Sequence, residues 1–152
     1  MKRNYKILRM HDYPLGLDKA IEYYHSKWGR EGNYSFIEDA IKNCNYQDIP
    51  QFFIAVKGEK IVACCGLIAN DYISRHDLYP WLCGVFVEES ERKRGLAGKL
   101  LSFAEQEAKR VGYKWLYLST DHKSFYERYN WEYIGDGYQP DGDAARIYKK
   151  NL

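Results

Sequence analysis

A short basic turn joins the two most regular hydrophobic patterns in this chain. Before the turn, Trp81–Val87 is an apolar run of strand length. After the turn, apolar residues at helical spacing predict a long amphipathic helix, which Gly112 ends: Leu96, Leu100, Leu101, Ala104, Ala108 and Val111. This order favours a fold in which helices cover the faces of a sheet.

The other segments fit the same architecture. Gln51–Lys57 and Lys60–Ile68 have strand patterns on either side of a two-residue turn, which predicts a hairpin. Helices are expected over Leu17–Trp28 and over residues 35–43, where Ser35 and Glu38 form a capping-box pattern. Further strands are expected at residues 6–10, 115–119, 132–134 and 145–149, and a short helix at 123–129. The 152 residues fit one domain spanning 1–152, built on a mixed sheet.

Composition excludes several classes of protein. Lys and Arg number 23 and Asp and Glu 21, and the net charge of +2 predicts neither a nucleic-acid nor a membrane partner. No run approaches ~18 apolar residues, and no apolar stretch follows the basic N-terminus, so neither a membrane span nor a signal peptide is expected. We expect a cytoplasmic protein whose cysteines are reduced thiols: Cys44, Cys64, Cys65 and Cys83. The histidines share no metal-ligand spacing, so no metal site is predicted.

The basic turn has the features of an anion site. The first N–H groups of a helix lack internal partners and carry the positive end of the helix dipole. Gly95 would let an anion approach the backbone, and Arg92, Lys93, Arg94 and Lys99 would add positive charge. Neither the P-loop pattern nor the dinucleotide fingerprint is present. From these residues alone, a phosphate site and an exposed basic loop of no special function are equally open.

Two segments resemble a known family. Arg92-x-x-Gly95-x-Ala97 resembles the Arg/Gln-x-x-Gly-x-Gly/Ala signature of the GNAT superfamily of N-acetyltransferases. Residues 116–119 and 124–131 resemble the later GNAT segment, a strand followed by a short helix with Phe-Tyr-Glu-x-x-Gly-Phe/Trp, although Asn130 replaces the usual glycine. The resemblance runs from about Gln51 to the end and is closest to bacterial enzymes. The first fifty residues match only by their strand-helix-helix order.

This resemblance implies a fold and a donor. The implied fold is α/β (α+β) and GNAT-like, with a mixed, mostly antiparallel sheet of about six or seven strands and about four helices. A splayed strand pair would hold acetyl-CoA, which would be the cosubstrate. The resemblance places the following residues at acetyl-CoA: Val85, Phe86, Val87, Arg92, Lys93, Arg94, Gly95, Leu96, Ala97, Gly98, Lys99, Ser119 and Phe125.

The resemblance also makes Tyr126 the candidate general acid that protonates the leaving thiolate. At reference pKa values of ~10 for tyrosine and ~8.5 for a thiol, this proton transfer is uphill by roughly 2 kcal/mol. Packing is the alternative role in a chain with 15 tyrosines. The base that deprotonates the amine stays open between water and five side chains: Asp71, His76, Asp77, Glu88 and Glu89.

We therefore expect an acetyl-CoA-dependent N-acetyltransferase that acts on a primary amine of a small molecule or peptide, by direct attack in a ternary complex. The alternative is a non-catalytic module of the same fold that binds acetyl-CoA as a sensor. Trp28 and Trp81 are expected in the core or in the wall of the acceptor pocket. The sequence identifies neither the acceptor nor the oligomeric state, and a homodimer is compatible with it.

Overall fold

A computed structural model describes residues 4–152. Within this range, one seven-stranded sheet has the order β1-β2-β3-β4-β5-β7-β6. All neighbouring strands are antiparallel except β4 and β5, which are parallel. The strands are β1 (Tyr5–Arg9), β2 (Gln51–Lys57), β3 (Lys60–Ile68), β4 (Trp81–Val87), β5 (Trp115–Thr120), β6 (Glu132–Tyr138) and β7 (Ala144–Asn151). The helices are α1 (Leu17–Trp28), α2 (Tyr34–Lys42), α3 (Leu96–Arg110) and the 3-10 turns η1 (Met10–Asp12), η2 (Glu89–Glu91) and η3 (Tyr126–Tyr129).

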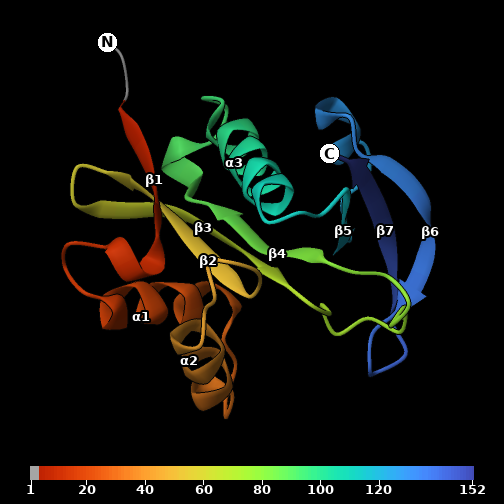
Figure 1. Cartoon of the computed structure of the whole chain (residues 1–152), viewed down its shortest axis with the longest axis horizontal. Helices are drawn as coiled ribbons and strands as arrows, with labels where there is room; N and C mark the ends of the chain where they lie inside the picture. Colours follow the sequence, from red (N-terminus) through yellow and green to blue (C-terminus); the bar gives the residue numbers. More distant parts are fainter. Residues whose placement is uncertain (1–3) are drawn as a thin grey trace.

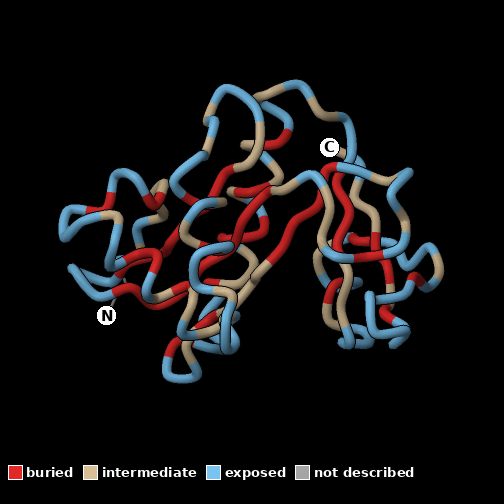
Figure 2. Tube along the Cα trace, turned by 90° about the horizontal axis from the view of Figure 1, so that it is seen from below, coloured by how far each residue is buried: buried red, intermediate tan, exposed pale blue. Residues whose placement is uncertain are grey.

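Helices cover both faces of the first four strands, with α3 on one face and α1 and α2 on the other (Figure 1). Strand β2 shows how the sequence produces these layers. Its Phe53 and Ala55 face the cluster that contains the apolar side of α3, while Phe52 and Ile54 face the cluster of α1 and α2. Because neither face meets solvent, the strand is a continuous apolar run rather than an alternating one. Figure 2 shows the buried residues following the strands through the centre.

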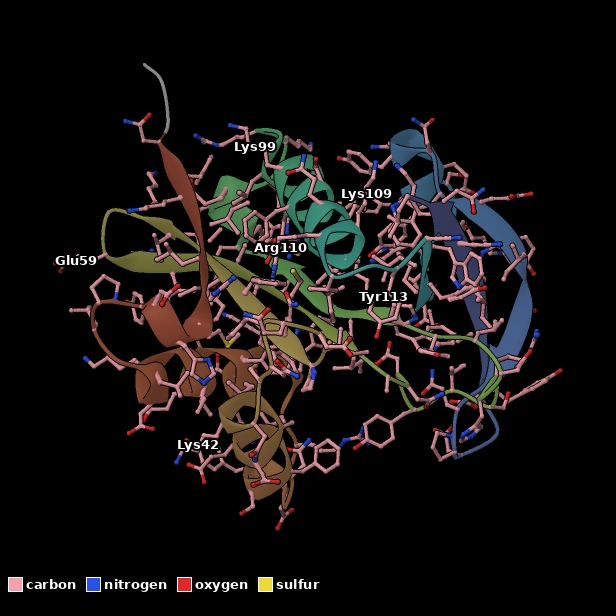
Figure 3. All side chains as sticks on the ribbon, in the orientation of Figure 1. Lys42, Glu59, Lys99, Lys109, Arg110 and Tyr113 are labelled. Atoms are coloured by element: carbon pink, nitrogen blue, oxygen red, sulfur yellow. The ribbon has the colours of Figure 1, made fainter. Side chains whose placement is uncertain are left out.

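The C-terminal end of α3 is tied to the chain that follows α2. The Arg110 guanidinium donates to the Tyr46 carbonyl at 2.7 Å, and the Tyr113 hydroxyl donates to Asp48 Oδ1 at 2.6 Å. Figure 3 labels Arg110 and Tyr113 at this end and Lys99 near the opposite end of the helix. These bonds connect α3 to the segment that leads into β2.

Most of the expected elements are confirmed. Strand β1 is shifted by one residue and β7 is one residue longer at its start and two at its end, and three further differences follow. Helix α2 begins at Tyr34, so the capping role expected for Ser35 is wrong. Asn33 precedes the helix instead, and its side chain accepts a hydrogen bond from the Arg30 N–H. The helix expected at residues 123–129 is reduced to the 3-10 turn η3, so the described chain has three α-helices rather than about four. The strand expected at 132–134 extends to Tyr138, because β7 pairs along its whole length.

The expectation of free thiols is confirmed for all four cysteines, three of which are buried. Burial raises the pKa of the Cys65 and Cys83 thiols well above the usual range, so both stay protonated at neutral pH. The longest helix among residues 4–152 has 15 residues, and none there combines the length and apolar character needed to cross a membrane.

Candidate active site

Strand β4 separates from β5 after a single pairing, Trp81 with Tyr117. On its other side, β4 carries one extra residue relative to β3: Gly84 and Val85 lie opposite Cys65. Gly84 has φ +60°, a left-handed conformation that glycine adopts without strain. A bulge bends the strand that carries it, and beyond Trp81 no residue of β4 pairs with β5. The splayed strand pair implied by the family resemblance is therefore present in the fold.

The splay exposes backbone groups on the β5 side of β4. The Glu88 N–H donates to the Val62 carbonyl on the β3 side at 2.8 Å. Because N–H and C=O groups alternate along a strand, those of Val85 and Val87 point to the opposite edge, where no β5 residue pairs with them. The Val87 carbonyl accepts a hydrogen bond from Arg92 Nε at 3.0 Å. The Val85 carbonyl and the N–H groups of both valines remain at this open edge.

Two side chains of helix α1 contact the bulge at Gly84. The Trp28 indole N–H donates to the Gly84 carbonyl at 2.9 Å. One turn earlier on the same helix, the Tyr24 ring lies against the Gly84 Cα, where an added Cβ would clash with the hydroxyl and come within 2.7 Å of Cε2. Two aromatic side chains of α1 therefore fix the position and the conformation of Gly84. Trp28 is 44% exposed and lines a cavity, whereas Trp81 is fully buried.

The basic turn is anchored at its start by Glu91, a buried carboxylate. The Tyr5 hydroxyl donates to Glu91 Oε1 at 2.7 Å, and Lys57 Nζ lies 3.4 Å from the same oxygen. The hydrogen bond from Tyr5, assisted by Lys57, holds the pKa of Glu91 below its usual range. Gly95 then adopts φ +80° and α3 begins at Leu96. This anchoring places the N-terminal turn of α3 directly after the open edge of β4.

The surroundings of the basic turn determine which groups can reach an anion. A Cβ built on Gly95 would meet no atom within 4 Å, so the space in front of the helix is open. Arg92, Lys93, Arg94 and Lys99 are exposed around this space. Leu96 has its side chain in the core, so only its backbone could contact an anion in this space. Gly98 lies against Tyr129, whose Cε1 would be 2.9 Å from an added Cβ, so its small size also serves helix packing.

A cavity of about 1060 Å³ lies where β4 and β5 separate, between α1, α2 and the loops that follow β3 and β5. Its lining includes the bulge residues Gly84 and Val85 and, from the other half of the sheet, Ser119 and Tyr126. Aromatic rings from α1, α2 and the β3–β4 loop complete it: Tyr24, Trp28, Phe36 and Tyr72. The open edge of β4 therefore borders a space large enough for a small-molecule substrate.

Tyr126 begins η3 and is 7% exposed, with its ring packed against Phe125, Trp131 and Tyr148. Burial raises the pKa of its phenol to about 12, and the Cys65 thiol and Asp71 add to that shift. The phenol is therefore protonated at neutral pH. No side chain among residues 4–152 hydrogen-bonds the Tyr126 hydroxyl, which leaves it available to a bound molecule. Phe125, also expected at the donor, supports the Tyr126 ring at a centroid distance of 5.0 Å.

Asp71 is the one member of the five-residue base set that lines the cavity. Its Oδ2 accepts a hydrogen bond from the Ser119 hydroxyl at 3.3 Å. Burial raises the pKa of Asp71 from its usual 3.8 to about 7, although the hydrogen bond from Ser119 opposes that shift. The other acidic candidates are outside the cavity: Glu88 pairs with Lys27 and Asp77 with Arg75, each at 2.8 Å, and Glu89 is exposed. His76 is exposed as well.

Sequence reasoning missed the residues that shape the bulge. Gly84 is one of 12 glycines and stands in no recognised motif. Tyr24 and Trp28 stand four residues apart, a spacing that put them on one face of α1 but gave no sign of what that face contacts. Residues 4–152 contain no group of three or more side chains placed to hold a metal ion.

The sequence and the fold were compared with known families and with solved structures. Residues 48–133 match the family model described as an acetyltransferase (GNAT) domain. No curated protein matches the sequence significantly. Among solved structures, an aminoglycoside 6'-N-acetyltransferase complexed with coenzyme A is 16% identical, covers 96% of each chain and has a TM-score of 0.72. An aminoglycoside 6'-acetyltransferase type Ii is 19% identical, with 96% of each chain covered and a TM-score of 0.70.

A third similar structure is a GNAT family acetyltransferase from Elizabethkingia anophelis with acetyl-CoA bound. It is 15% identical, with 99% of this chain and 100% of that chain covered, and the TM-score is 0.67. At these identities, the structures establish a shared fold. The family model covers more than half of the residues, including the bulge, the basic turn and Tyr126. This chain therefore belongs to the GNAT acetyltransferase family.

Proposed function

We propose that this protein transfers the acetyl group of acetyl-CoA to a primary amine of a small molecule or peptide, by direct attack in a ternary complex. The observation that carries this proposal is one cavity bordered by the open edge of β4, the Tyr126 phenol and the Asp71 carboxylate. Family membership supports acetyl transfer, and the coenzyme A and acetyl-CoA bound in two of the similar structures support the donor.

The residues after the bulge fit acetyl-CoA as a substrate. The free N–H groups at the start of α3, with the exposed cations of the basic turn, would hold the pyrophosphate. The open space in front of Gly95 allows that approach. Val85 and Val87 would pair with the amide groups of the pantetheine arm, in the way an added strand pairs with a sheet edge. This placement directs the thioester toward the cavity and Tyr126.

Asp71 is suited to remove a proton from the incoming ammonium. A lysine-like ammonium has a pKa of ~10.4, so transfer to a carboxylate of pKa 3.8 is uphill by roughly 9 kcal/mol. At the pKa of about 7 that burial gives Asp71, the cost falls to roughly 5 kcal/mol. The Ser119 hydroxyl holds the carboxylate in place at 3.3 Å. We therefore assign Asp71 as the general base, with one proton passing from the amine to its carboxylate.

Val85 and Tyr126 would act on the two sides of the thioester C–S bond, Val85 at the carbonyl and Tyr126 at the sulfur. The Val85 N–H would donate to the thioester oxygen as the amine nitrogen forms the new C–N bond. Tyr126 would give its proton to the sulfur as the C–S bond breaks. The second proton of the attacking nitrogen would pass through water to the phenolate, and Asp71 would release the proton it took from the ammonium to solvent. Transfer from a phenol of pKa about 12 to a thiolate of pKa ~8.5 is uphill by roughly 5 kcal/mol. The same burial raises the pKa of a thiolate bound beside Tyr126 and so reduces that cost.

A panel of primary amines tests the proposal. Wild-type protein is incubated with acetyl-CoA and each amine in turn, free thiol release is followed with time, and the products are identified by mass. We expect thiol release that depends on the amine and an acetylated amine as the product. Binding of acetyl-CoA without amine-dependent release for any member of a broad panel would contradict catalysis and favour a non-catalytic sensor.

A further inference from the structure

Three large aromatic side chains with exposed surface line the mouth of the cavity. Phe36 on α2 is 58% exposed, Tyr72 in the β3–β4 loop is 54% exposed, and Trp28 at the end of α1 is 44% exposed. The Phe36 and Tyr72 rings contact each other at a centroid distance of 5.5 Å. Single exposed apolar residues are common on proteins. Three from separate elements around one cavity form an apolar surface suited to a ligand.

Tyr72 is held at this mouth in a strained conformation. Its φ is +52°, a left-handed conformation that is unfavourable for a residue with a Cβ. The Asn70 side chain stabilises the turn, because it accepts from the Ile73 N–H and donates to the Ile73 carbonyl, both at 3.3 Å. Ile73 is itself buried. The loop therefore places an exposed ring over the cavity at a conformational cost, which is a feature of binding sites rather than of packing.

The charges around the cavity limit the number of amines that an acceptor can carry. The lining contains two carboxylates, Asp71 and Asp121, one guanidinium, Arg30, and the imidazole of His122. Arg30 lines the same cavity as Tyr72, and its charge opposes the burial that raises the pKa of the Tyr72 phenol. A polycation would bring several ammonium groups against Arg30 with too few carboxylates to pair them. The charges favour an acceptor with one ammonium group, directed at Asp71.

We infer that the acceptor is a small molecule in which one primary amine is joined by a short chain to an aromatic ring. The ring packs against Phe36, Tyr72 and Trp28 at the mouth of the cavity, and the amine reaches Asp71. This inference rests on the proposed acetyl transfer and narrows its substrate class. It separates this protein from the two aminoglycoside-acetylating enzymes to which its fold is similar.

Three probes test the inference on the wild-type protein: 2-phenylethylamine, butylamine and kanamycin. Each aromatic contact strengthens binding by a factor of roughly two to ten, and three rings face the ligand. We therefore expect kcat/KM for 2-phenylethylamine to exceed that for butylamine by about tenfold or more, and that for kanamycin by a larger factor. Equal or higher kcat/KM for butylamine or kanamycin would overturn the inference while leaving acetyl transfer intact. If no amine is acetylated, the proposed function and this inference both fail.

Variants of Phe36 and Tyr72 test whether the preference for an aromatic amine comes from the rings at the mouth of the cavity. Phe36→Ala and Tyr72→Ala should each raise KM for 2-phenylethylamine about five- to tenfold, with kcat and the KM for acetyl-CoA nearly unchanged. Phe36→Leu should restore part of the affinity. Tyr34→Ala is the matched control, because Tyr34 is an exposed aromatic residue on the same helix that packs on His25 outside the cavity. An equal loss for butylamine, or an equal effect of Tyr34→Ala, would show that the rings stabilise α2 and do not select the acceptor.

Discussion

The role proposed for Asp71 depends on its burial, and it predicts a specific pH dependence of kcat/KM. Burial raises the pKa of its carboxyl to about 7, so the basic form accumulates only as the pH rises through that value. We expect kcat/KM for the amine to rise between about pH 6 and 8. Tyr126, with a pKa of about 12, should add no descending limb below pH 10. In Asp71→Asn, activity should fall and the inflection near pH 7 should disappear.

The same shift affects the free energy of unfolding. The folded-state pKa of Asp71 lies above the usual 3.8, so the folded protein binds this proton more tightly than the unfolded chain. Its stabilising effect is complete below about pH 4 and is lost as the pH rises to about 7. Asp71→Asn should therefore gain thermal stability relative to wild type over that interval. Asp77→Asn, at an exposed residue paired with Arg75, is the control. If instead the pH profile of kcat/KM is the same in Asp71→Asn as in wild type, the general base is another group or water.

At the residue scale, the sequence shows which side chains could act as the general base or acid, but it does not show which of them are buried in the cavity. Asp71 and Asp77 stand in the same polar loop, and nothing local distinguishes them. Only the fold shows that Asp71 turns inward to Ser119 whereas Asp77 pairs with Arg75 at the surface. Tyr126 was one of 15 tyrosines and was selected through its resemblance to a family motif. Its position in the cavity agrees with that selection, and its catalytic role stays a prediction.

At the scale of elements, the bulge in β4 is the feature most open to a stability test. Gly84→Ala should destabilise the fold by about 2–4 kcal/mol, because it adds left-handed strain and a clash with Tyr24. Gly58→Ala is the matched control, since Gly58 has φ +65° but open space around its Cα, and it should cost only about 1–2 kcal/mol. Urea unfolding of both variants measures the difference. Equal costs would mean that α1 does not clamp the bulge.

The N-terminal turn of α3 can be tested with a pair of variants at Gly95. Asn and Asp both tolerate left-handed φ better than most residues, so Gly95→Asn and Gly95→Asp should both fold. Only Asp places a negative charge where the pyrophosphate would lie. We expect Gly95→Asp to weaken acetyl-CoA binding at least tenfold more than Gly95→Asn, by calorimetry. Equal affinities for acetyl-CoA in the two variants would place the pyrophosphate elsewhere.

Elements were easier to predict than their junctions. Strands β2, β3 and β4 are buried on both faces, so each appears in the sequence as an uninterrupted apolar run. Strand β6 is an exposed edge strand with little alternation of apolar and polar residues, so the sequence predicted only its first three residues as a strand. The bulge left no local signal, because it depends on contacts between Gly84 and a helix more than fifty residues earlier.

At the scale of the whole molecule, the sheet consists of two parts joined by one pairing between β4 and β5. Strands β1 to β4 lie on one side of this junction and β5 to β7 on the other, as Figure 1 shows. The cavity at the junction takes the groups proposed to react from both parts and its aromatic wall largely from the first fifty residues. That region resembled the family only in the order of its elements. The sequence therefore made specific predictions for residues that bind the donor, which stay predictions, and it made none for the acceptor.

The most direct test of acetyl transfer in this cavity compares Tyr126→Phe with Tyr129→Phe. Both changes remove one phenol oxygen, but only Tyr126 lines the cavity. With an amine that the wild type acetylates, Tyr126→Phe should lower kcat by ~10²–10⁴-fold and leave the Kd for acetyl-CoA unchanged, because the proton is needed only as the thiolate leaves. Tyr129→Phe should change both little. Wild-type kcat in Tyr126→Phe, or a loss of acetyl-CoA affinity that matches the loss of rate, would contradict the role of Tyr126 as the acid.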